Sequence, residues 1–537
     1  MRPTRIRDKI MLQLSNFDRV METETISKNG ASPKSQMSRG KIMQRAFLFF
    51  IAFFVSVTSA FAQGVIRYVK TTTTGTGDGS SWANAAADIQ SMINASAVGD
   101  QVWIAGGTYL IATTLLMKNG INVYGGFQGS ESNINARSKS DLDANGTIDA
   151  WEFTNATILD GQNATRVLSY AGNSFNMETT WDGVTITKGY ADKGAGAYII
   201  ANGKLNNCIV TQNNNRNSFA VYGGGIYNNG GMVNNCIVYR NTIGTSYFGG
   251  RVIHNLTAQG AGIYNTGTVS NCMIFDNYCD CRADGSSTAA ADGGGIYNYG
   301  GFVNTCCIYN NSIYAISSGT VSTYLGAGGI HNSTIPSSKK VAYVYCSTIL
   351  NNGENNIYNY YGDYALANNC IVENSDLEQN FIRPTSFVGQ ANDDAQRAEL
   401  LRASWRLKQG SQYVETGSLT NLPDWIINGT DLAANPRVSN GKISVGAYEF
   451  DPTVNVIKLT HLDNGIKIYP NPVINSFIVD YEGFIQVKIY DMLGKEILSQ
   501  DTNGKTEMNI NHLPKGIYNV SIISEGKVIG NSKIMKQ

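Results

Sequence analysis

A short motif recurs through the middle of the chain and constrains its fold more than any other feature. The copies GGGIYNNGGMVNNCIVYRN, GAGIYNTGTVSNCMIFDN and GGGIYNYGGFVNTCCIYNN begin at Gly223, Gly260 and Gly293. Each unit is too short to enclose a core of its own, so successive units must stack on one another. Most of the variation in unit length follows the last asparagine of the motif, which predicts insertions at one point of each unit.

The aligned copies predict two columns of identical side chains. A cysteine recurs at equivalent positions, and the residue two places later shares its face of a strand. An asparagine stands five residues after each of the first five cysteines. We expect an inward column of cysteines and a ladder of asparagine amides, because stacked strands bring identical side chains together. The cysteines are Cys208, Cys236, Cys272, Cys306, Cys346 and Cys370, and the asparagines are Asn213, Asn241, Asn277, Asn311 and Asn351.

The apolar runs of the repeat are brief, rich in Ile, Val and Tyr, and without a helical period. These properties indicate short strands. Strands that recur once per unit in one direction stack as parallel sheets, and the usual chirality of parallel crossovers predicts a right-handed coil. We therefore predict an all-β fold: a right-handed parallel β-helix over residues 63–450, with ~12 coils.

The nine cysteines raise the question of disulfides. Stacked cysteines have parallel Cβ vectors, a geometry that suits a disulfide poorly, so we expect free thiols that act as small apolar groups. Cys279 and Cys281 lie in an insertion and are predicted to be the more reactive pair. A metal site at this pair lacks two further ligands nearby.

Residues 41–62 read as a secretory signal peptide. A basic start at Lys41 and Arg45 is followed by a short apolar run and by the small residues Ala60 and Ala62, so Gln63 is expected to begin the mature chain. The apolar run is shorter than the ~20 residues that span a bilayer. Because a signal normally begins the chain, residues 1–40 are interpreted as a doubtful extension, with translation starting at Met37 or Met43. No transmembrane helix is expected in the mature chain.

One stretch, DLDANGTIDAWE, matches a twelve-residue calcium loop in all its positions. Carboxylates and amides fill positions 1, 3 and 5, Gly146 supplies the turn at 6, and Ile148 fills the apolar eighth place. Oxygen ligands at these spacings suit Ca²⁺, so we predict a structural calcium site. The alternative is a solvated insertion in the β-helix. The predicted ligands are Asp141, Asp143, Asn145, Thr147 through its carbonyl, Asp149 through water, and Glu152.

No catalytic residue is predicted. Asp182, Asp276, Asp292 and Glu373 stand at non-equivalent positions of the repeat, and the four histidines are dispersed. The net charge of zero gives no reason to expect nucleic acid as a partner. The abundant tyrosines of the repeats are interpreted as cross-strand stacking on a sheet face, with an aromatic platform for sugars as the alternative.

The repeats resemble those of polymorphic outer-membrane proteins, in which Gly-Gly-x-Ile alternates with a Phe-x-x-Asn-like element. The flanking segments also resemble those of bacterial surface β-helix proteins. Among them are AAADIQSMI, expected to be a helix that caps the first coil, and DLAANPRVSNGKISVGAYEF (Asp431–Phe450), expected to be the closing coil. The resemblance implies a solenoid of the pectate lyase type, a fold that hosts lyases, hydrolases and adhesins alike.

After a linker over residues 451–465, residues 466–537 alternate apolar and polar side chains over several short runs. This pattern predicts a small Ig-like antiparallel β-sandwich. The segment resembles the type A C-terminal sorting domain of the type IX secretion system. That resemblance implies binding to the secretion machinery, removal of the tail, and release or attachment to surface lipopolysaccharide. The residues that carry it include Tyr469, Pro470, Asn471, Pro472, Gly494, Lys495, Gly516 and Tyr518.

Two functions are compatible with these features. The first is an extracellular or surface-attached adhesin, a module that binds a glycan or a ligand on another cell. The second is a polysaccharide lyase or glycoside hydrolase whose site has no recognisable motif. A groove with two or more converging carboxylates favours the enzyme, and its absence favours binding.

Overall fold

The computed structural model describes most of the chain from Gly64 to Lys536. The predicted signal residues Ala60, Ala62 and Gln63 lie outside the described residues. Within 64–536, the description omits residues 144, 146, 171–173, 216–218, 248–254, 285–286, 318–322, 335–340, 361–364, 373–375, 386, 389–390, 452–465, 471–472, 482, 492–494 and 525–526.

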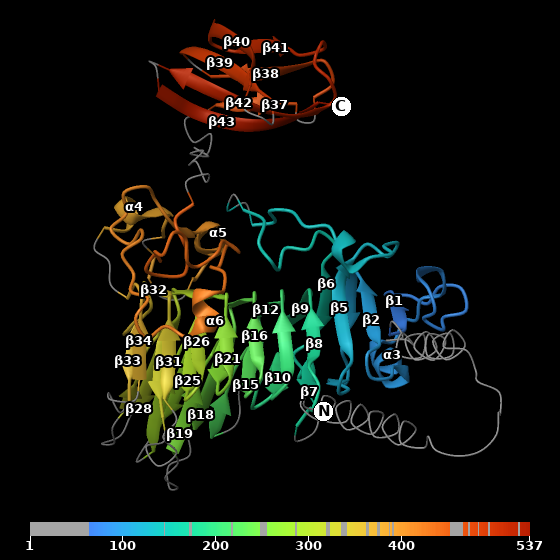
Figure 1. Cartoon of the computed structure of the whole chain (residues 1–537), viewed down its shortest axis with the longest axis vertical. Coiled ribbons are helices and arrows are strands. Elements are labelled where there is room, and N and C mark those ends of the chain that lie inside the picture. The colour runs from blue at the N-terminus through green and yellow to red at the C-terminus, as the bar shows by residue number, and fades with distance from the viewer. Residues whose placement is uncertain are drawn as a thin grey trace, which may run out of the picture. The chain divides into compact units, whose positions relative to one another are not determined.

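Three long sheets, here called A, B and C, build a parallel β-helix (Figure 1). Each coil contributes one strand to each sheet in turn, and every strand pair within them is parallel. Sheet A contains β1 (Ile66–Val69), β2 (Gln101–Ala105), β5 (Asn122–Phe127), β8 (Thr179–Asp182), β11 (Gly203–Asn206), β16 (Met232–Asn234), β21 (Thr268–Ser270), β26 (Phe302–Asn304), β31 (Ala342–Tyr345) and β34 (Ala365–Asn368).

Sheets B and C complete the coils, and apolar side chains from all three sheets fill the interior. Sheet B contains β3 (Gly107–Leu110), β6 (Thr157–Asp160), β9 (Val184–Thr187), β12 (Ile209–Thr211), β17 (Ile237–Tyr239), β22 (Met273–Phe275), β27 (Cys307–Tyr309) and β32 (Thr348–Leu350). Sheet C contains β4 (Leu115–Met117), β7 (Leu168–Tyr170), β10 (Ala197–Ile200), β15 (Ile226–Asn229), β20 (Ile263–Asn265), β25 (Ile296–Tyr299), β30 (Ile330–Ser333) and β33 (Ile357–Asn359).

The predicted parallel β-helix is confirmed, but the expected number of coils is wrong. The longest sheet has ten strands in the described part of the chain. The predicted closing coil, Asp431–Phe450, contributes no described strand to sheets A, B or C. It lies against the last coil instead, where the Gly446 amide donates to the Asn369 carbonyl at 2.9 Å and the Ala447 amide to Thr348 Oγ1 at 3.1 Å.

The cap helix predicted at the first coil is confirmed as α3 (Ile89–Ala95), which follows the 3₁₀ turn η1 (Trp82–Asn84). Asp88 begins the helix, and its carboxylate accepts a hydrogen bond from the Ser91 amide. Ile89 and Ile93 are buried in the interior cluster of the β-helix. The helix therefore covers apolar side chains that the first coil would otherwise expose.

The cysteine column is present, with a shift of one residue in one coil. Cys236 and Cys272 are buried in adjoining layers, because the register pairs Ile237 with Met273. Ser347, rather than Cys346, continues the column: the Cys306 amide donates to Ser347 Oγ at 3.1 Å. The prediction for Cys346 is wrong because the register of β32 is set by its apolar residues.

All nine cysteines are free thiols. Cys279 and Cys281 are both buried, and burial raises the pKa of the Cys281 thiol to about 12 and that of Cys279 well above its usual range. Reactive cysteines have exposed sulfur atoms and lowered pKa values. The prediction that these two form a reactive pair is therefore wrong.

Asparagine side chains link the coils in two ladders. In the predicted ladder, the Asn277 amide donates to Asn311 Oδ1 at 2.8 Å and to the Val238 and Phe275 carbonyls at 2.9 and 3.0 Å. The ladder continues through Asn352, not through the predicted Asn351, for the same register shift, and Asn352 donates in turn to Asn356 Oδ1 at 3.1 Å. A second ladder, from the IYN segment of the repeat, runs through Asn228, Asn265, Asn298, Asn332 and Asn359, with spacings of 2.8–3.0 Å.

The repeat glycines stand where neighbouring coils approach closely. A Cβ atom at Gly225 would lie 2.7 Å from the Gly262 carbonyl oxygen and 3.0 Å from the Asn241 side chain. Contacts below 3.0 Å require the backbone to shift, so only glycine fits between the two coils at this point.

The insertions predicted after the repeat asparagine form a second ordered layer. Two four-stranded parallel sheets, D and E, face each other around a core of small residues that includes Cys279, Cys281, Ala289 and Ala291. Each excursion leaves sheet B along sheet D and returns along sheet E to sheet C. Sheet D contains β13 (Asn214–Asn215), β18 (Thr242–Tyr247), β23 (Tyr278–Ala283) and β28 (Ser312–Ser317), and sheet E contains β14 (Ala220–Tyr222), β19 (Asn255–Gln259), β24 (Thr288–Asp292) and β29 (Thr323–Leu325).

The outer face of sheet B is covered by other parts of the chain. Rings of Phe275 and Tyr309 stack at 4.9 Å and belong to a buried cluster with Trp151 and Trp405. The covering elements come from an insertion between β5 and β6 and from the region after β34. The elements after β34 that cover sheet B are α4 (Leu377–Asn380), β35 (Phe381–Arg383), α5 (Asp394–Arg402) and β36 (Ser404–Leu407). The insertion also contains η2 (Ile134–Ala136), while α6 (Asp424–Ile427) packs against sheet A.

The C-terminal domain has its own core and only antiparallel strand pairs among its sheets. Its described strands form one sheet of three and one of four, as predicted for a small sandwich. No helix in the described residues is long and apolar enough to cross a membrane. The strands are β37 (Lys467–Tyr469), β38 (Ser476–Asp480), β39 (Phe484–Tyr490), β40 (Glu496–Asn503), β41 (Thr506–Asn509), β42 (Gly516–Ser524) and β43 (Lys527–Lys536).

Replacing one ladder residue tests how much the asparagine ladder stabilises the fold. Asn277→Ala leaves the Asn241 amide groups without their partner at a fully buried site. We expect the free energy of unfolding to fall by about 3 kcal/mol, measured by urea unfolding with circular dichroism. Asn229→Ala, at an exposed position of β15, is the control and should change it by less than about 0.5 kcal/mol. Equal stability of the two variants would contradict the role of the ladder.

Candidate metal centre

The predicted calcium loop projects from the insertion between β5 and β6. Lys139 and Phe153 pair as an antiparallel bridge at its base, and the Ser140 amide donates to the Glu152 carbonyl at 3.2 Å. These backbone contacts bring residues 141 and 152 to the same end of the loop. The first and last predicted ligands therefore become neighbours.

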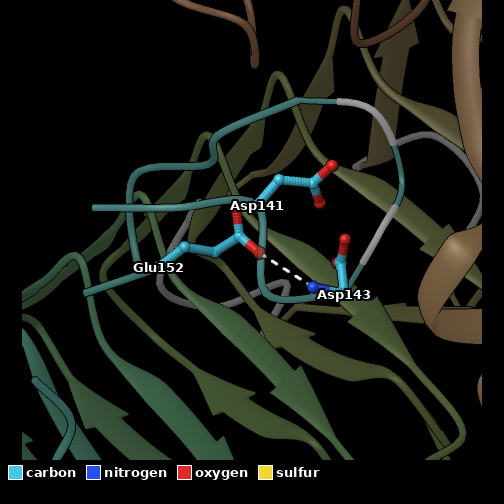
Figure 2. A group of neighbouring side chains, drawn as sticks. All are labelled: Asp141, Asp143 and Glu152. Atoms are coloured by element: carbon cyan, nitrogen blue, oxygen red, sulfur yellow. Dashed lines mark hydrogen bonds between the residues drawn. The ribbon is translucent and has the colours of Figure 1, made fainter. Parts of the chain in front are cut away.

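Three carboxylates meet inside this loop. Asp141, Asp143 and Glu152 each place one carboxylate oxygen within 4.8 Å of the others, and Figure 2 shows the three side chains gathered within the loop. Glu152 is 2% exposed, and its carboxylate holds both sides of the loop by hydrogen bonds to backbone amides. Its Oε1 accepts hydrogen bonds from the Leu142 amide at 2.7 Å and the Asp143 amide at 3.2 Å, and its Oε2 accepts one from the Asp149 amide at 2.7 Å.

The remaining predicted ligands join the same cluster. Asn145 Nδ2 donates to Asp143 Oδ2 at 3.2 Å and to Asp149 Oδ2 at 3.0 Å, so a single amide bridges two carboxylates. The Thr147 amide donates to Asn145 Oδ1 at 2.8 Å. Gly146, predicted to supply the sharp turn, lies outside the described residues.

The electrostatics of the loop fit a site for a cation. Burial, followed by the charge of Glu152, raises the pKa of Asp143 to about 8. Burial also raises the pKa of Asp149 to about 6, although the Asn145 hydrogen bond acts in the opposite direction. The donor set consists of oxygen atoms from carboxylate, amide and carbonyl groups, which are the ligands that Ca²⁺ prefers.

The loop is anchored to the β-helix by the residues that flank it. Trp151 is 4% exposed and packs in the cluster on the outer face of sheet B. Phe153 lies under the Arg137 guanidinium at 4.5 Å, and Arg137 forms a 2.7 Å ion pair with Asp182 of β8. The insertion therefore contacts several coils rather than only the one from which it departs.

Three of the four acids that the sequence left unassigned are described, and each has a basic neighbour. Asp182 pairs with Arg137, and Asp292 Oδ1 lies 3.1 Å from His331 Nδ1. Glu373 lies outside the described residues. Of the three described acids, Asp276 lines a cavity to which neither Asp182 nor Asp292 contributes.

Asp276 lines a cavity of about 250 Å³ together with Arg240 and Arg397. Burial raises the pKa of its carboxyl to about 6, although the amide of Ala391 and the two arginines lower it. This site is not predicted from sequence, but a signal exists: Arg240 and Asp276 both stand immediately before a ladder asparagine, so they occupy equivalent positions in adjoining coils.

A second, smaller cavity of about 160 Å³ lies between sheet A and α6. Trp425, whose side chain is half exposed, and Arg437 are among its lining residues. No carboxylate is among the described residues that line it.

The tyrosines of sheet C form a stacked ladder along the coils. Tyr264 stacks on Tyr227 at 4.8 Å and on Tyr297 at 5.2 Å, with the ring planes 10° and 19° apart. The stack continues to Tyr198 at one end and to His331 at the other. Each inner ring has neighbours on both faces, so it has no free face for a sugar. These tyrosines therefore form cross-strand stacks, as expected.

The described residues of the predicted sorting motif lie in the C-terminal domain. The Tyr518 hydroxyl donates to the Pro514 carbonyl at 2.8 Å, and Tyr469 reaches Asp480 at 3.2 Å. The Lys495 amide donates to Asp491 Oδ1 at 2.9 Å. Pro470 directly follows β37, and Gly516 begins β42. The other motif residues, Asn471, Pro472 and Gly494, lie outside the described residues.

A family model described as the secretion system C-terminal sorting domain matches residues 467–537. The C-terminal domain is a type IX sorting domain. Such a domain interacts with the type IX secretion machinery and indicates export of the chain, to the cell surface or the medium. The sorting domain covers the tail alone, so it assigns no activity to the β-helix.

Comparison of the whole chain with solved structures adds a structural similarity. The chain is similar to the crystal structure of pectate lyase Pel9A, with 14% sequence identity, a TM-score of 0.38, and coverage of 72% of this chain and 96% of that chain. A similarity this low carries no argument about activity. No curated protein matches the chain.

Deletion of residues 466–537 tests the role of the sorting domain. In a host with a type IX secretion system, we expect the shortened chain to accumulate in the periplasm, because the segment that the machinery binds is gone. Fractionation and immunoblotting measure its location. Phe484→Ala, at a side chain that is 76% exposed and outside the predicted motif, should be exported normally. Surface display of the shortened chain would contradict this assignment.

Proposed function

We propose that this chain is an exported adhesin-like protein that binds a glycan or another surface ligand without transforming it. The observation that carries this proposal is the distribution of carboxylates around the two cavities. Asp276 is the one carboxylate among the described residues that line the larger cavity, and the smaller has none. Glycoside hydrolases use a pair of carboxylates across the scissile bond, an arrangement that neither cavity provides.

The sorting domain supports the location that this function requires. Export by the type IX system delivers the β-helix outside the cell, where it stays attached to surface lipopolysaccharide or is released after removal of the tail. A β-helix suits this role because its stacked coils hold a long surface in one conformation without moving parts.

We also propose that residues 141–152 bind Ca²⁺ and that the ion has a structural role. Asp141, Asp143 and Glu152 supply carboxylate oxygens that already lie within 4.8 Å of one another. Asn145, Thr147 and Asp149 supply the remaining ligands, with the side-chain amide of Asn145 turned to present its oxygen. The ion would neutralise the carboxylates, which lie close together in the folded loop and repel one another.

The anchoring of the loop explains what the ion would stabilise. Trp151 and Glu152 are adjacent, and both are almost fully buried. Trp151 packs against rings of sheet B, while Glu152 holds both sides of the loop through three backbone amides. An ion bound by Glu152 would therefore fix the loop and, through it, the cover over sheet B.

Calorimetry with Ca²⁺ tests the proposed site. We expect one ion per chain with a Kd of about 0.1–1 mM, the range of extracellular calcium modules, and a higher melting temperature in saturating Ca²⁺. Asp141→Asn and Glu152→Gln should abolish the heat and the shift in melting temperature. Asp394→Asn, at a side chain that is 99% exposed, is the charge-matched control and should bind as the wild type does. Absence of heat with the wild type would refute the site.

The alternative function, a polysaccharide lyase or hydrolase, depends on Asp276. Its carboxyl has a pKa near the range of a general base, and it shares a cavity with two arginines. A lyase could use such an arrangement to neutralise a uronate and remove a proton. This alternative is weaker because Asp276 Oδ1 is already occupied by the Ala391 amide at 2.9 Å.

A combined assay separates binding from catalysis. The mature chain is applied to a glycan array and incubated with a panel of extracellular polysaccharides, with detection of reducing ends and of unsaturated products. We expect binding to at least one glycan and no product above the level without protein. Product formation that disappears in Asp276→Asn but persists in Asp78→Asn, at an exposed residue that does not line the cavity, would establish the enzyme instead.

A further inference from the structure

In each of five successive coils, one residue adopts a left-handed conformation immediately before the ladder asparagine. These residues are here called the turn column: Gln212, Arg240, Asp276, Asn310 and Asn351, with φ between 51° and 57°. Their backbones turn sharply at the end of sheet B, and their side chains follow one another at the spacing of the coils. The turn column is therefore a row of polar groups along one edge of the β-helix.

Three members of the turn column hold a segment of the chain itself. Asn351 Nδ2 donates to the Thr385 carbonyl at 2.6 Å, and Asn310 Nδ2 donates to the Phe387 carbonyl. Asp276 Oδ1 accepts a hydrogen bond from the Ala391 amide. Successive coils thus bind successive polar groups of one segment that runs along the edge.

The next two members of the turn column line the larger cavity. Arg240 and Gln212 follow Asp276 along the edge, and both line the 250 Å³ space. Neither side chain has a hydrogen bond or an ion pair to another described residue. The row of polar groups therefore continues beyond the segment that occupies its first part.

The side chains that line the cavity indicate which kind of ligand it can bind. Arg240 and Arg397 supply guanidinium groups, which bind carboxylates and sulfates through paired N–H donors. Asn214 and Thr242 add an amide and a hydroxyl. Ala391 is the one apolar residue in the described lining, so the cavity offers no pocket for an apolar peptide side chain. Its volume is below the ~300 Å³ of sites for drug-sized ligands, which suits a single small unit of a longer chain.

We propose that this cavity binds an anionic saccharide unit, with its oxyanion on Arg240 and Arg397 and its hydroxyl groups on Gln212, Asn214 and Thr242. The proposal rests on the binding function proposed above and adds the class of ligand. The oxyanion is a carboxylate or a sulfate ester, since both match the guanidinium fork. The rest of the saccharide extends along the turn column, beyond the members that contact Thr385, Phe387 and Ala391.

A substitution of Asp276 is expected to change binding in the opposite direction to a substitution of Arg240. Its negative charge in the cavity opposes an anionic ligand. The substitution Asp276→Asn removes that charge and keeps a side-chain oxygen that can accept the Ala391 hydrogen bond. This variant is therefore expected to strengthen binding, while Arg240→Gln weakens it. A change that merely disturbs the local fold would not strengthen binding.

The experiment is calorimetric titration of the full mature chain with three tetrasaccharides: a carboxylated one from alginate, a sulfated one from carrageenan, and neutral maltotetraose. We expect one or both anionic probes to bind and maltotetraose not to bind. Arg240→Gln should weaken binding about 10- to 100-fold, because a hydrogen bond to a charged group is lost. Asp276→Asn should strengthen it several-fold. Arg282→Gln, at a half-exposed arginine of sheet D, is the charge-matched control and should bind as the wild type does.

The carboxylated and sulfated probes identify which oxyanion the site takes. Anionic probes that bind wild type and Arg240→Gln equally, or that fail to bind the wild type at millimolar concentration, would overturn the proposed ligand site. The binding function would survive that result if the glycan array still showed a ligand whose binding is unaffected by Arg240→Gln. Cleavage of the probes, rather than stable binding, would overturn the binding function itself.

Discussion

The stacking of coils in register is the constraint on which the rest of the structure depends. Hydrogen bonds between parallel strands hold each coil in register with the next. The asparagine ladders maintain the same register through hydrogen bonds between side chains. A buried amide that donates to a carbonyl of its own coil and to the asparagine of the next has few alternative partners. Each ladder therefore favours one alignment of neighbouring coils, and the interior columns follow from it.

The repeat identified the architecture because a column leaves a direct trace in the sequence. Cys236, Cys272 and Cys306 recur with the same neighbours, and all three are buried in the interior. The same reasoning failed by one residue at Cys346, where a cysteine stands beside the column position without occupying it. Identity of residue type was a weaker guide there than the apolar pattern, since Ile308 pairs with Ile349. The second ladder, at Asn228 and its equivalents, left an equally clear trace in the IYN segment.

The features that sequence did not reveal depend on contacts between distant segments. The meeting of Asp141, Asp143 and Glu152 could be predicted because all three lie within twelve residues, but the anchoring of their loop through Trp151 depends on rings such as Tyr309, far along the chain. The cavity beside Arg240 depends in the same way on Arg397, which follows it by more than one hundred residues. Local motifs thus give the ligand set of a site, while its walls are assembled only by the fold.

The paired sheets D and E have a consequence for how the protein can change in evolution. Among the described residues, their strands pair with the equivalent strands of adjoining coils. One excursion lengthened alone would therefore have no partner for its added backbone groups. Duplication or loss of a complete winding preserves every partnership, whereas a partial insertion breaks several at once. We therefore expect related chains to differ in this region by whole windings. The Ala and Cys positions between the two sheets should keep small residues, so that the sheets remain in contact.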